Sequence, residues 1–173
     1  MSVRNRVRLR TMVTTDAEVI FKFYEEGIQT GHAPFEAEVP DWHKWDSRHL
    51  TQCRWLAEEE DNVLGWGALT QVSPRKVYSG MAEVSIYVSG TAQNQGIGSV
   101  LLERLIISSE ESGFWTLQAQ VFSENKISIY VHEKQGFRKS GTRRQLALMS
   151  YGSMAGEWRD PVLMERRSKI AGI

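Results

Sequence analysis

The chain has 173 residues, 41% of them hydrophobic, which is enough to bury the core of one domain. Its 21 basic and 21 acidic residues cancel, so no overall charge favours nucleic acid or an anionic membrane as a partner. The single cysteine, Cys53, excludes an internal disulfide, and neither a signal peptide nor a long apolar segment is present. We therefore expect one cytoplasmic domain over residues 1–173, with Cys53 as an ordinary helix residue.

The N-terminal segment alternates between arginine and other residues over positions 3–10. This alternation predicts a strand, and its charged face is typical of the edge of a sheet. Next, Thr15 and Glu18 have the spacing of a capping box, and apolar residues then recur at helical intervals. A first helix is predicted from about Asp16 to Ile28.

A loop is predicted after this helix, because Gly31 and Pro34 interrupt the pattern. It carries Phe35 beside Glu36, and such a loop can line a substrate pocket. Residues 41–50 then form a second predicted helix. The histidines of this region do not have the spacing of a zinc site, so we expect no metal; they are His32, His43 and His49.

The middle of the chain predicts two strands. The acidic residues 58–61 are expected to be a solvated helix end and turn, followed by a strand over Asn62–Val72. A loop over residues 73–80, containing Arg75 and Tyr78, leads to an alternating strand over residues 82–88. In that strand Glu83 lies on one face with Ser85 and Tyr87.

A glycine-rich turn, Gln93 to Ser99, follows the second strand and opens a helix. Gly96 and Gly98 let the main chain approach a ligand closely, and the first N–H groups of a helix lack intrahelical acceptors. The helix dipole adds partial positive charge at this end. The turn therefore predicts a site for an anion such as a pyrophosphate, although it is not a Walker loop or a dinucleotide fingerprint.

The C-terminal part alternates strands with one helix. A strand is predicted over Trp115–Phe122, Asn125 caps a helix that runs through Glu133, and Gly136 ends it. Late strands over residues 137–141 and 160–166 complete the pattern. Together the elements predict an α+β sheet protein without internal repeats.

Four further motifs accompany the glycine-rich turn. They are Thr-Gly-x-Ala-x-Phe-Glu at 30–36, Glu-x-Ser-x-Tyr-Val at 83–88, Asn-x-x-Ser-Ile-x-x-His-Glu-x-x-Gly-Phe at 125–137 and Gly-x-Trp-x-Asp at 156–160. With these motifs the chain resembles the phosphinothricin acetyltransferase branch of the GNAT superfamily over residues 8–167. The resemblance implies the GNAT acyl-CoA N-acyltransferase fold, a mixed and mostly antiparallel sheet flanked by helices.

The resemblance also implies an activity. Acetyl-CoA would give its acetyl group to the amine of a small amino-acid-like substrate, of the phosphinothricin, methionine sulfoximine, methionine sulfone or arsinothricin type. It further suggests a homodimer. Pro34 and Met154 depart from the usual pattern of the family and leave the exact substrate open. A protein acetyltransferase and a non-catalytic acyl-CoA sensor of the same fold are the alternatives.

The site residues implied by the resemblance form three groups. An amine attacks a thioester only when neutral, so a base is needed; Glu83 is the candidate, and His132 or its rival Tyr130 is the candidate acid. Contacts to phosphinothricin-like substrates would come from Phe35, Glu36, Arg75 and Tyr78. Contacts to acetyl-CoA would come from Ile86, Tyr87, Val88, Gln93, Asn94, Gln95, Gly96, Ile97, Gly98, Ser99, Asn125 and Ser128.

Overall fold

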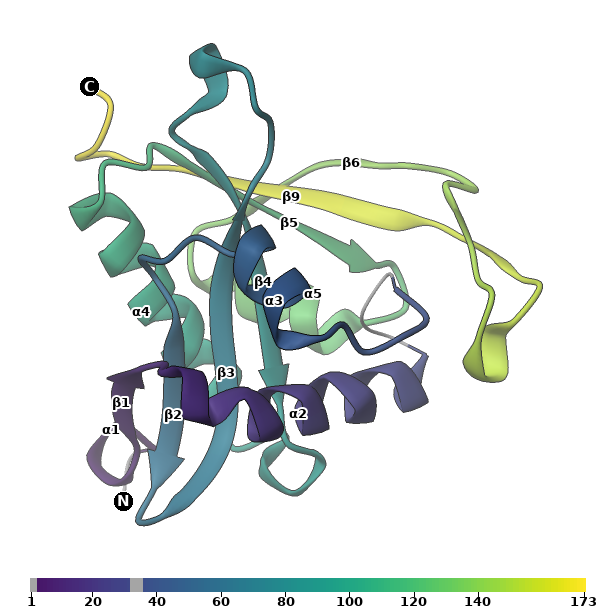
Figure 1. Ribbon diagram of the computed structural model, residues 1–173. Coiled ribbons are helices and arrows are strands. Elements are labelled where there is room, and N and C mark those ends of the chain that lie inside the picture. The colour runs from purple at the N-terminus through teal and green to yellow at the C-terminus, as the bar shows by residue number, and fades with distance from the viewer. Residues whose placement is uncertain (1–2, 32–35) are drawn as a thin grey trace.

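The computed structural model describes residues 3–31 and 36–173 (Figure 1). Its main sheet has seven strands in the order β1-β2-β3-β4-β5-β9-β6, and β7 and β8 form a separate pair. The strands are β1 (Arg8–Thr11), β2 (Trp55–Glu59), β3 (Asn62–Gln71), β4 (Met81–Val88), β5 (Thr116–Phe122), β6 (Arg138–Thr142), β7 (Ala147–Leu148), β8 (Trp158–Arg159) and β9 (Pro161–Arg167). The helices are α1 (Val3–Arg6), α2 (Ala17–Thr30), α3 (Trp42–Arg48), α4 (Ile97–Glu111) and α5 (Lys126–Lys134).

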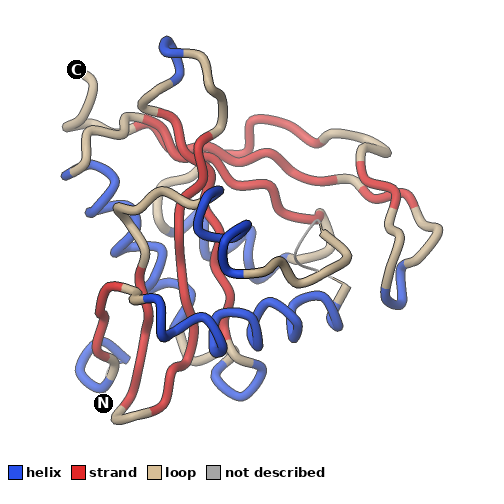
Figure 2. The backbone as a smooth tube through the Cα atoms, viewed as in Figure 1, coloured by secondary structure: helices blue, strands red, loops and turns tan. Residues whose placement is uncertain are grey.

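Helices cover both faces of the sheet, with α2 and α3 in front and α4 and α5 behind (Figures 1 and 2). Strand β3 explains this arrangement, because successive side chains of a strand point to opposite faces. Trp66 packs with Ile20 of α2. On the other face, a Cβ at Gly67 would lie 2.9 Å from Leu105 Cδ1. The lack of a side chain at Gly67 therefore lets α4 approach the sheet closely.

The two central strands separate part-way along their length. All neighbouring strands are antiparallel except β4 and β5, which run parallel and pair only as far as Glu83 and Gln118. Beyond that point β4 continues beside β3, while β5 continues beside β9 as far as Phe122. The sheet is therefore split between β4 and β5, with the mixed, mostly antiparallel pattern that the sequence predicts.

Local signals placed several helix ends correctly. Helix α2 ends at Thr30, two residues beyond the predicted end at Ile28, and Gly31 follows it with a left-handed φ of +67°. Helix α5 begins as expected, because the Asn125 side chain accepts a hydrogen bond from the Ser128 main-chain N–H at 3.1 Å. Gly136, with φ +84°, follows its end. Capping residues and glycines thus fix these boundaries.

Three local predictions were wrong. Residues 3–10 are not one strand, because α1 precedes β1, although β1 is an edge strand as expected. The acidic run is not a helix end: Glu58 lies in β2 and is only 6% exposed, since Arg8 and Arg10 pair with it. Cys53 is buried but lies in a bend with φ +61°, outside any helix.

Candidate active site

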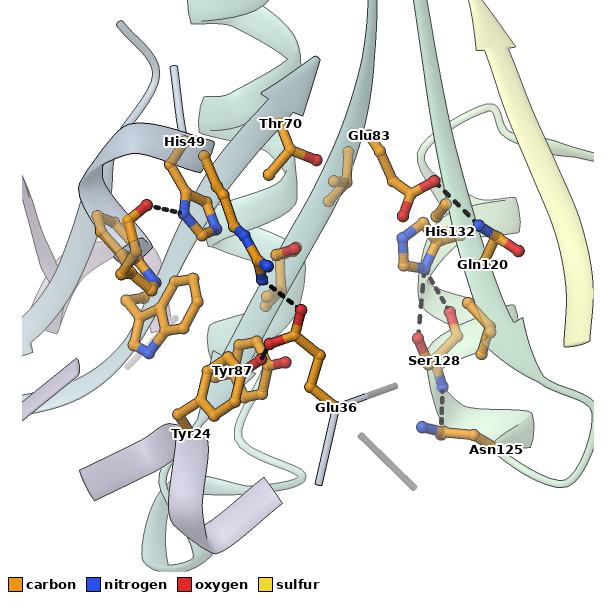
Figure 3. Close-up of a pocket in the computed structure, with 18 of the residues that line it drawn as sticks. Tyr24, Glu36, His49, Thr70, Glu83, Tyr87, Gln120, Asn125, Ser128 and His132 are labelled. Carbon is orange, nitrogen blue, oxygen red and sulfur yellow. Dashed lines mark hydrogen bonds and ion pairs between the residues drawn. The ribbon is translucent and has the colours of Figure 1, made fainter. Parts of the chain in front are cut away.

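A cavity of about 270 Å³ lies at the split between β4 and β5. Residues of α2, α3 and the loops beside them form one wall, and residues of β5 and α5 form the other (Figure 3). Glu83, Ser85 and Tyr87 of β4 form its floor. They share a face because they pair in register with alternate residues of β3. The split therefore becomes a pocket that reaches both layers of helices.

Glu83 points into this pocket. It is half-buried, and its Oε2 accepts hydrogen bonds from Gln118 Nε2 at 2.5 Å and from Gln120 Nε2 at 3.2 Å. Both amides belong to β5, so they hold the carboxylate at the point where the two strands part. Glu83 thus faces a protein cavity, whereas strand alternation alone also allowed a solvent-facing position.

His132 lies across the pocket from α3 and is 6% exposed. Its Nδ1 is 2.8 Å from the Ser128 carbonyl oxygen, which can only accept, so Nδ1 carries the proton. Burial lowers the pKa of His132, outweighing this hydrogen bond, and the neutral ring then has a bare Nε2. Within the described structure this buried Nε2 has no hydrogen-bond partner. The imidazole is therefore a proton acceptor in its resting form.

Tyr130 is turned away from this site. It is 58% exposed, lies beside Lys134 and does not line the pocket. Residues two positions apart on a helix point about 200° apart, so Tyr130 and His132 cannot both face the cavity. His132 and Glu83 therefore line the same pocket, and Tyr130 lies outside it.

Main-chain N–H groups also face the split. The Ser89 N–H donates to the Leu64 carbonyl of β3 at 2.9 Å. Since main-chain groups along a strand alternate between its two sides, the N–H groups of Ile86 and Val88 point toward β5. The paired register of β4 and β5 ends at Glu83, so these two N–H groups lie beyond it. Tyr87 directs its N–H toward β3 instead, and its side chain packs on Trp66.

The glycine-rich turn lies at the far end of β4. Gly96 has φ +84° and occupies the N-cap of α4, so Ile97 and Gly98 begin the helix as predicted. Gln95 accepts from Arg6 at 2.8 Å, and Ser99 Oγ accepts from Gln135 Nε2 at 3.1 Å. These contacts fix the side chains around the turn. The first main-chain N–H groups of α4, those of Ile97 and Gly98, have no intrahelical acceptor.

Of the described residues predicted to contact substrate, one lines the pocket and two lie outside it. Glu36 lines the pocket, accepts a hydrogen bond from the Tyr24 hydroxyl at 3.4 Å and pairs with Arg48. Phe35 lies outside the described residues. Arg75 and Tyr78 lie at the exposed turn between β3 and β4, and neither lines the pocket.

Arg48 and His49 are among the pocket residues that the sequence did not identify as site residues. Arg48 is the one permanent cation among the described pocket residues, and His49 follows it at the end of α3. Part of the evidence for His49 was present in the sequence, because helical spacing places Trp45 and His49 on one face of the predicted second helix. What the sequence lacked was the position of α3 over β3, where His49 bridges to Thr70.

Neither a metal-binding cluster nor a membrane-spanning helix is found in the described part of the chain. There, no three His, Cys, Asp or Glu side chains come close enough together to hold a metal ion. Across residues 3–31 and 36–173, no helix combines the length and apolar character needed to cross a membrane.

Comparison with known proteins decides the family. The model of the "Acetyltransferase (GNAT) family" matches residues 18–137, which include β4, the glycine-rich turn and His132. The chain belongs to the GNAT family. It is therefore an N-acetyltransferase, and the fold and family that the motifs predict are confirmed.

The relatives of this GNAT chain include acetyltransferases of phosphinothricin and of methionine sulfoximine. The phosphinothricin N-acetyltransferase of Alcaligenes faecalis is 32% identical over 91% of this chain and 81% of that protein. The L-methionine sulfoximine/L-methionine sulfone acetyltransferase of Pseudomonas paraeruginosa is 31% identical over 60% of this chain and 57% of that protein. The structure of a phosphinothricin acetyltransferase from Sinorhizobium meliloti in complex with AcCoA is 25% identical, with a TM-score of 0.84 over 96% of this chain and 91% of that one.

Proposed function

We propose that this GNAT chain transfers the acetyl group of acetyl-CoA to the amine of a small amino-acid-like substrate. The observation that carries this proposal is the pocket at the split. It joins a carboxylate held by two amides, a neutral imidazole and the main-chain N–H groups of β4 beyond its paired register with β5. Relatives that act on phosphinothricin and on methionine sulfoximine support this substrate class. A cavity of about 270 Å³ has the size for an amino acid, which disfavours a protein acetyltransferase.

The residues present fit acetyl-CoA, which supplies the reactive thioester. Its pyrophosphate would lie on the first N–H groups of α4, at Gly96, Ile97 and Gly98. Asn125 and Ser128 line the cavity on the α5 side and would contact the pantetheine arm. A sensor would need this half of the site and no proton acceptor, whereas Glu83 and His132 both face the cavity.

Glu83 begins the reaction in this proposal. Amines of this class have pKa values of about 9, so the substrate arrives protonated at pH 7, and the Glu83 carboxylate takes one proton directly or through water. The neutral amine attacks the acetyl carbonyl carbon, and the N–H groups of Ile86 and Val88 donate to the carbonyl oxygen as it becomes negative.

His132 completes the transfer of protons. Its bare Nε2 takes the second proton, from the positively charged nitrogen that forms the new bond. When the carbon–sulfur bond breaks, His132 gives that proton to the leaving thiolate, whose conjugate acid has a pKa of about 8.5. The products are an N-acetyl amide and free CoA thiol, and Glu83 returns its proton to solvent.

Replacing Gly98 with valine should raise the KM for acetyl-CoA about 10-fold by placing a branched side chain where the pyrophosphate binds. The fold should tolerate the change, because a Cβ at position 98 meets only Val88 Cγ2, at 3.7 Å. Gly141→Val is the matched control, since position 141 is open and lies in the edge strand β6. Equal KM values for both variants would remove the turn from the acetyl-CoA site.

The substrate anion is expected to meet Arg48. Arg48→Ala should weaken binding of the amino-acid substrate by about 1 to 2 kcal/mol, less than a fully buried contact because half of the side chain is exposed. Arg75→Ala is the control from outside the pocket, and initial-rate kinetics give the KM of both. Should Arg75→Ala raise that KM more than Arg48→Ala, the assignment of the anion contact to Arg48 would be wrong.

A homodimer in the cytoplasm remains part of the proposal. The exposed turn that carries Arg75 and Tyr78 lies away from its own pocket, so any contact between it and substrate would require a second chain. Light scattering at the working concentration tests the dimer, and a monomer mass would exclude it.

A further inference from the structure

Two histidines of the pocket are built in the same way. His49 Nδ1 lies 2.7 Å from the Trp45 carbonyl oxygen, just as His132 Nδ1 lies 2.8 Å from that of Ser128. Because a carbonyl oxygen only accepts, each Nδ1 carries a proton and each neutral ring has a bare Nε2. No hydrogen bond to His49 Nε2 comes from residues 3–31 or 36–173, and Figure 3 shows this nitrogen on the side of the ring turned to the pocket.

The His49 ring is held in this orientation. It stacks on Trp45 with ring centroids 4.0 Å apart and meets the edge of Trp66 at 6.2 Å. Burial lowers the pKa of His49 to about 4, and the positive charges of Arg54 and Arg48 act in the same direction. The hydrogen bond to the Trp45 carbonyl and the charge of Glu36 oppose this shift without cancelling it. The imidazole therefore stays neutral at pH 7 and presents a fixed hydrogen-bond acceptor.

The pocket divides into two ends. Glu83 and His132 lie at the split, where the reacting amine must meet the thioester, and His49 lies on the opposite wall (Figure 3). A substrate whose amine is at Glu83 would therefore extend its side chain toward His49. An acceptor atom placed against His49 Nε2 would leave two acceptors facing each other, which is costly in a site shielded from water.

We propose that His49 determines specificity by accepting a hydrogen bond from an N–H or O–H group on the substrate side chain. The inference rests on the proposed function and names the subclass of amino acid that this pocket prefers. Methionine sulfoximine and methionine sulfone test whether His49 prefers a substrate side chain that carries a hydrogen-bond donor, because the two compounds have nearly the same shape. The sulfoximine carries an N–H donor where the sulfone carries a second oxygen, so His49 selects the sulfoximine.

The test compares kcat/KM for these two amines in the wild-type enzyme and in His49→Phe. Phenylalanine keeps the ring and its stacking but lacks the acceptor. The wild type should prefer the sulfoximine about 10-fold, and His49→Phe should reduce this ratio to about one, through a higher KM for the sulfoximine. His43→Phe, at an exposed position of α3, is the matched control and should keep the wild-type ratio.

The possible failures are distinguishable. A wild type that acetylates both amines equally, or a His49→Phe variant that keeps the preference, overturns the role of His49 and leaves the proposed function standing. A wild type that acetylates neither amine overturns the role of His49, and the proposed function falls with it only if phosphinothricin is not acetylated either. If His49→Phe does not fold, the wild-type ratio alone decides, and a ratio of one or less overturns the proposal.

Discussion

Replacing Glu83 with glutamine should lower kcat at pH 7 by roughly 100-fold or more, the factor that general-base catalysis typically contributes. Glutamine has the same size and can still accept hydrogen bonds from Gln118 and Gln120, but it cannot take a proton from the amine. The KM for acetyl-CoA should be nearly unchanged. Initial rates over a pH series measure the effect, with Glu133→Gln as an exposed carboxylate control beside His132.

The pH series gives this prediction its sharpest outcome. As pH rises toward the pKa of the substrate amine, more of the amine is neutral without any enzymatic base, so the rate of Glu83→Gln should rise with that titration. A variant that keeps near-wild-type kcat at every pH would show that Glu83 is not the base. A variant that stays inactive at high pH, although it binds acetyl-CoA, would indicate a positioning role instead.

Replacing Arg10 with methionine should lower the free energy of unfolding by about 3 kcal/mol at pH 7. Arg10 donates to Asp16 through two hydrogen bonds of 2.8 Å and to Glu58 through a third of 2.8 Å. Asp16 and Glu58 are 8% and 6% exposed, so the variant leaves two buried carboxylates with much of their compensating charge removed. Urea unfolding of the purified variant measures the loss.

The pH dependence of stability follows from the same contacts. Hydrogen bonds from Arg10 are the main cause that holds the pKa values of Asp16 and Glu58 below their usual range. Their stabilising contribution is complete above the unfolded-state pKa of about 4 and is lost as pH falls through the lowered folded-state values. The difference between wild type and Arg10→Met should therefore shrink below about pH 4.

Arg138→Met is the control for this prediction, because Arg138 pairs with Glu165 on the surface and its side chain is 73% exposed. An exposed pair of this kind contributes at most about 1 kcal/mol. If Arg10→Met were no more destabilising than Arg138→Met, the Arg10 network would not be a main source of stability.

Elements with strong local patterns could be predicted from the sequence, and β2 could not. Helix α5 has a capping asparagine and a following glycine, and β4 alternates along its length. Strand β2 places Glu58 at a buried position. From the sequence alone an acidic residue here suggests exposure to solvent, because the residues that pair with it are not known. Those partners are Arg8 and Arg10, about fifty residues earlier in the chain. Burial of a charge is a property of the folded pairing, and no local window contains it.

The candidate site shows the same division. Glu83 and His132 are carried by motifs, and the structure places both in one pocket. Arg48 and His49 belong to the opposite wall, which forms only when α3 packs over β3. The charge of Arg75 and its place in a loop before β4 predict a substrate contact, but Arg75 does not line the pocket. Spacing predicts which residues share an element, and only tertiary packing decides which elements meet.

The most direct test of the central claim is a panel of amine substrates offered to the wild-type enzyme with acetyl-CoA. Release of CoA thiol gives the rate, and mass spectrometry identifies the acetylated product. We predict saturable N-acetylation of phosphinothricin or of methionine sulfoximine, and no turnover of basic peptides, because the cavity of about 270 Å³ fits a single amino acid. Acetylation of the peptides alone, with none of the amino acids modified, would contradict the account.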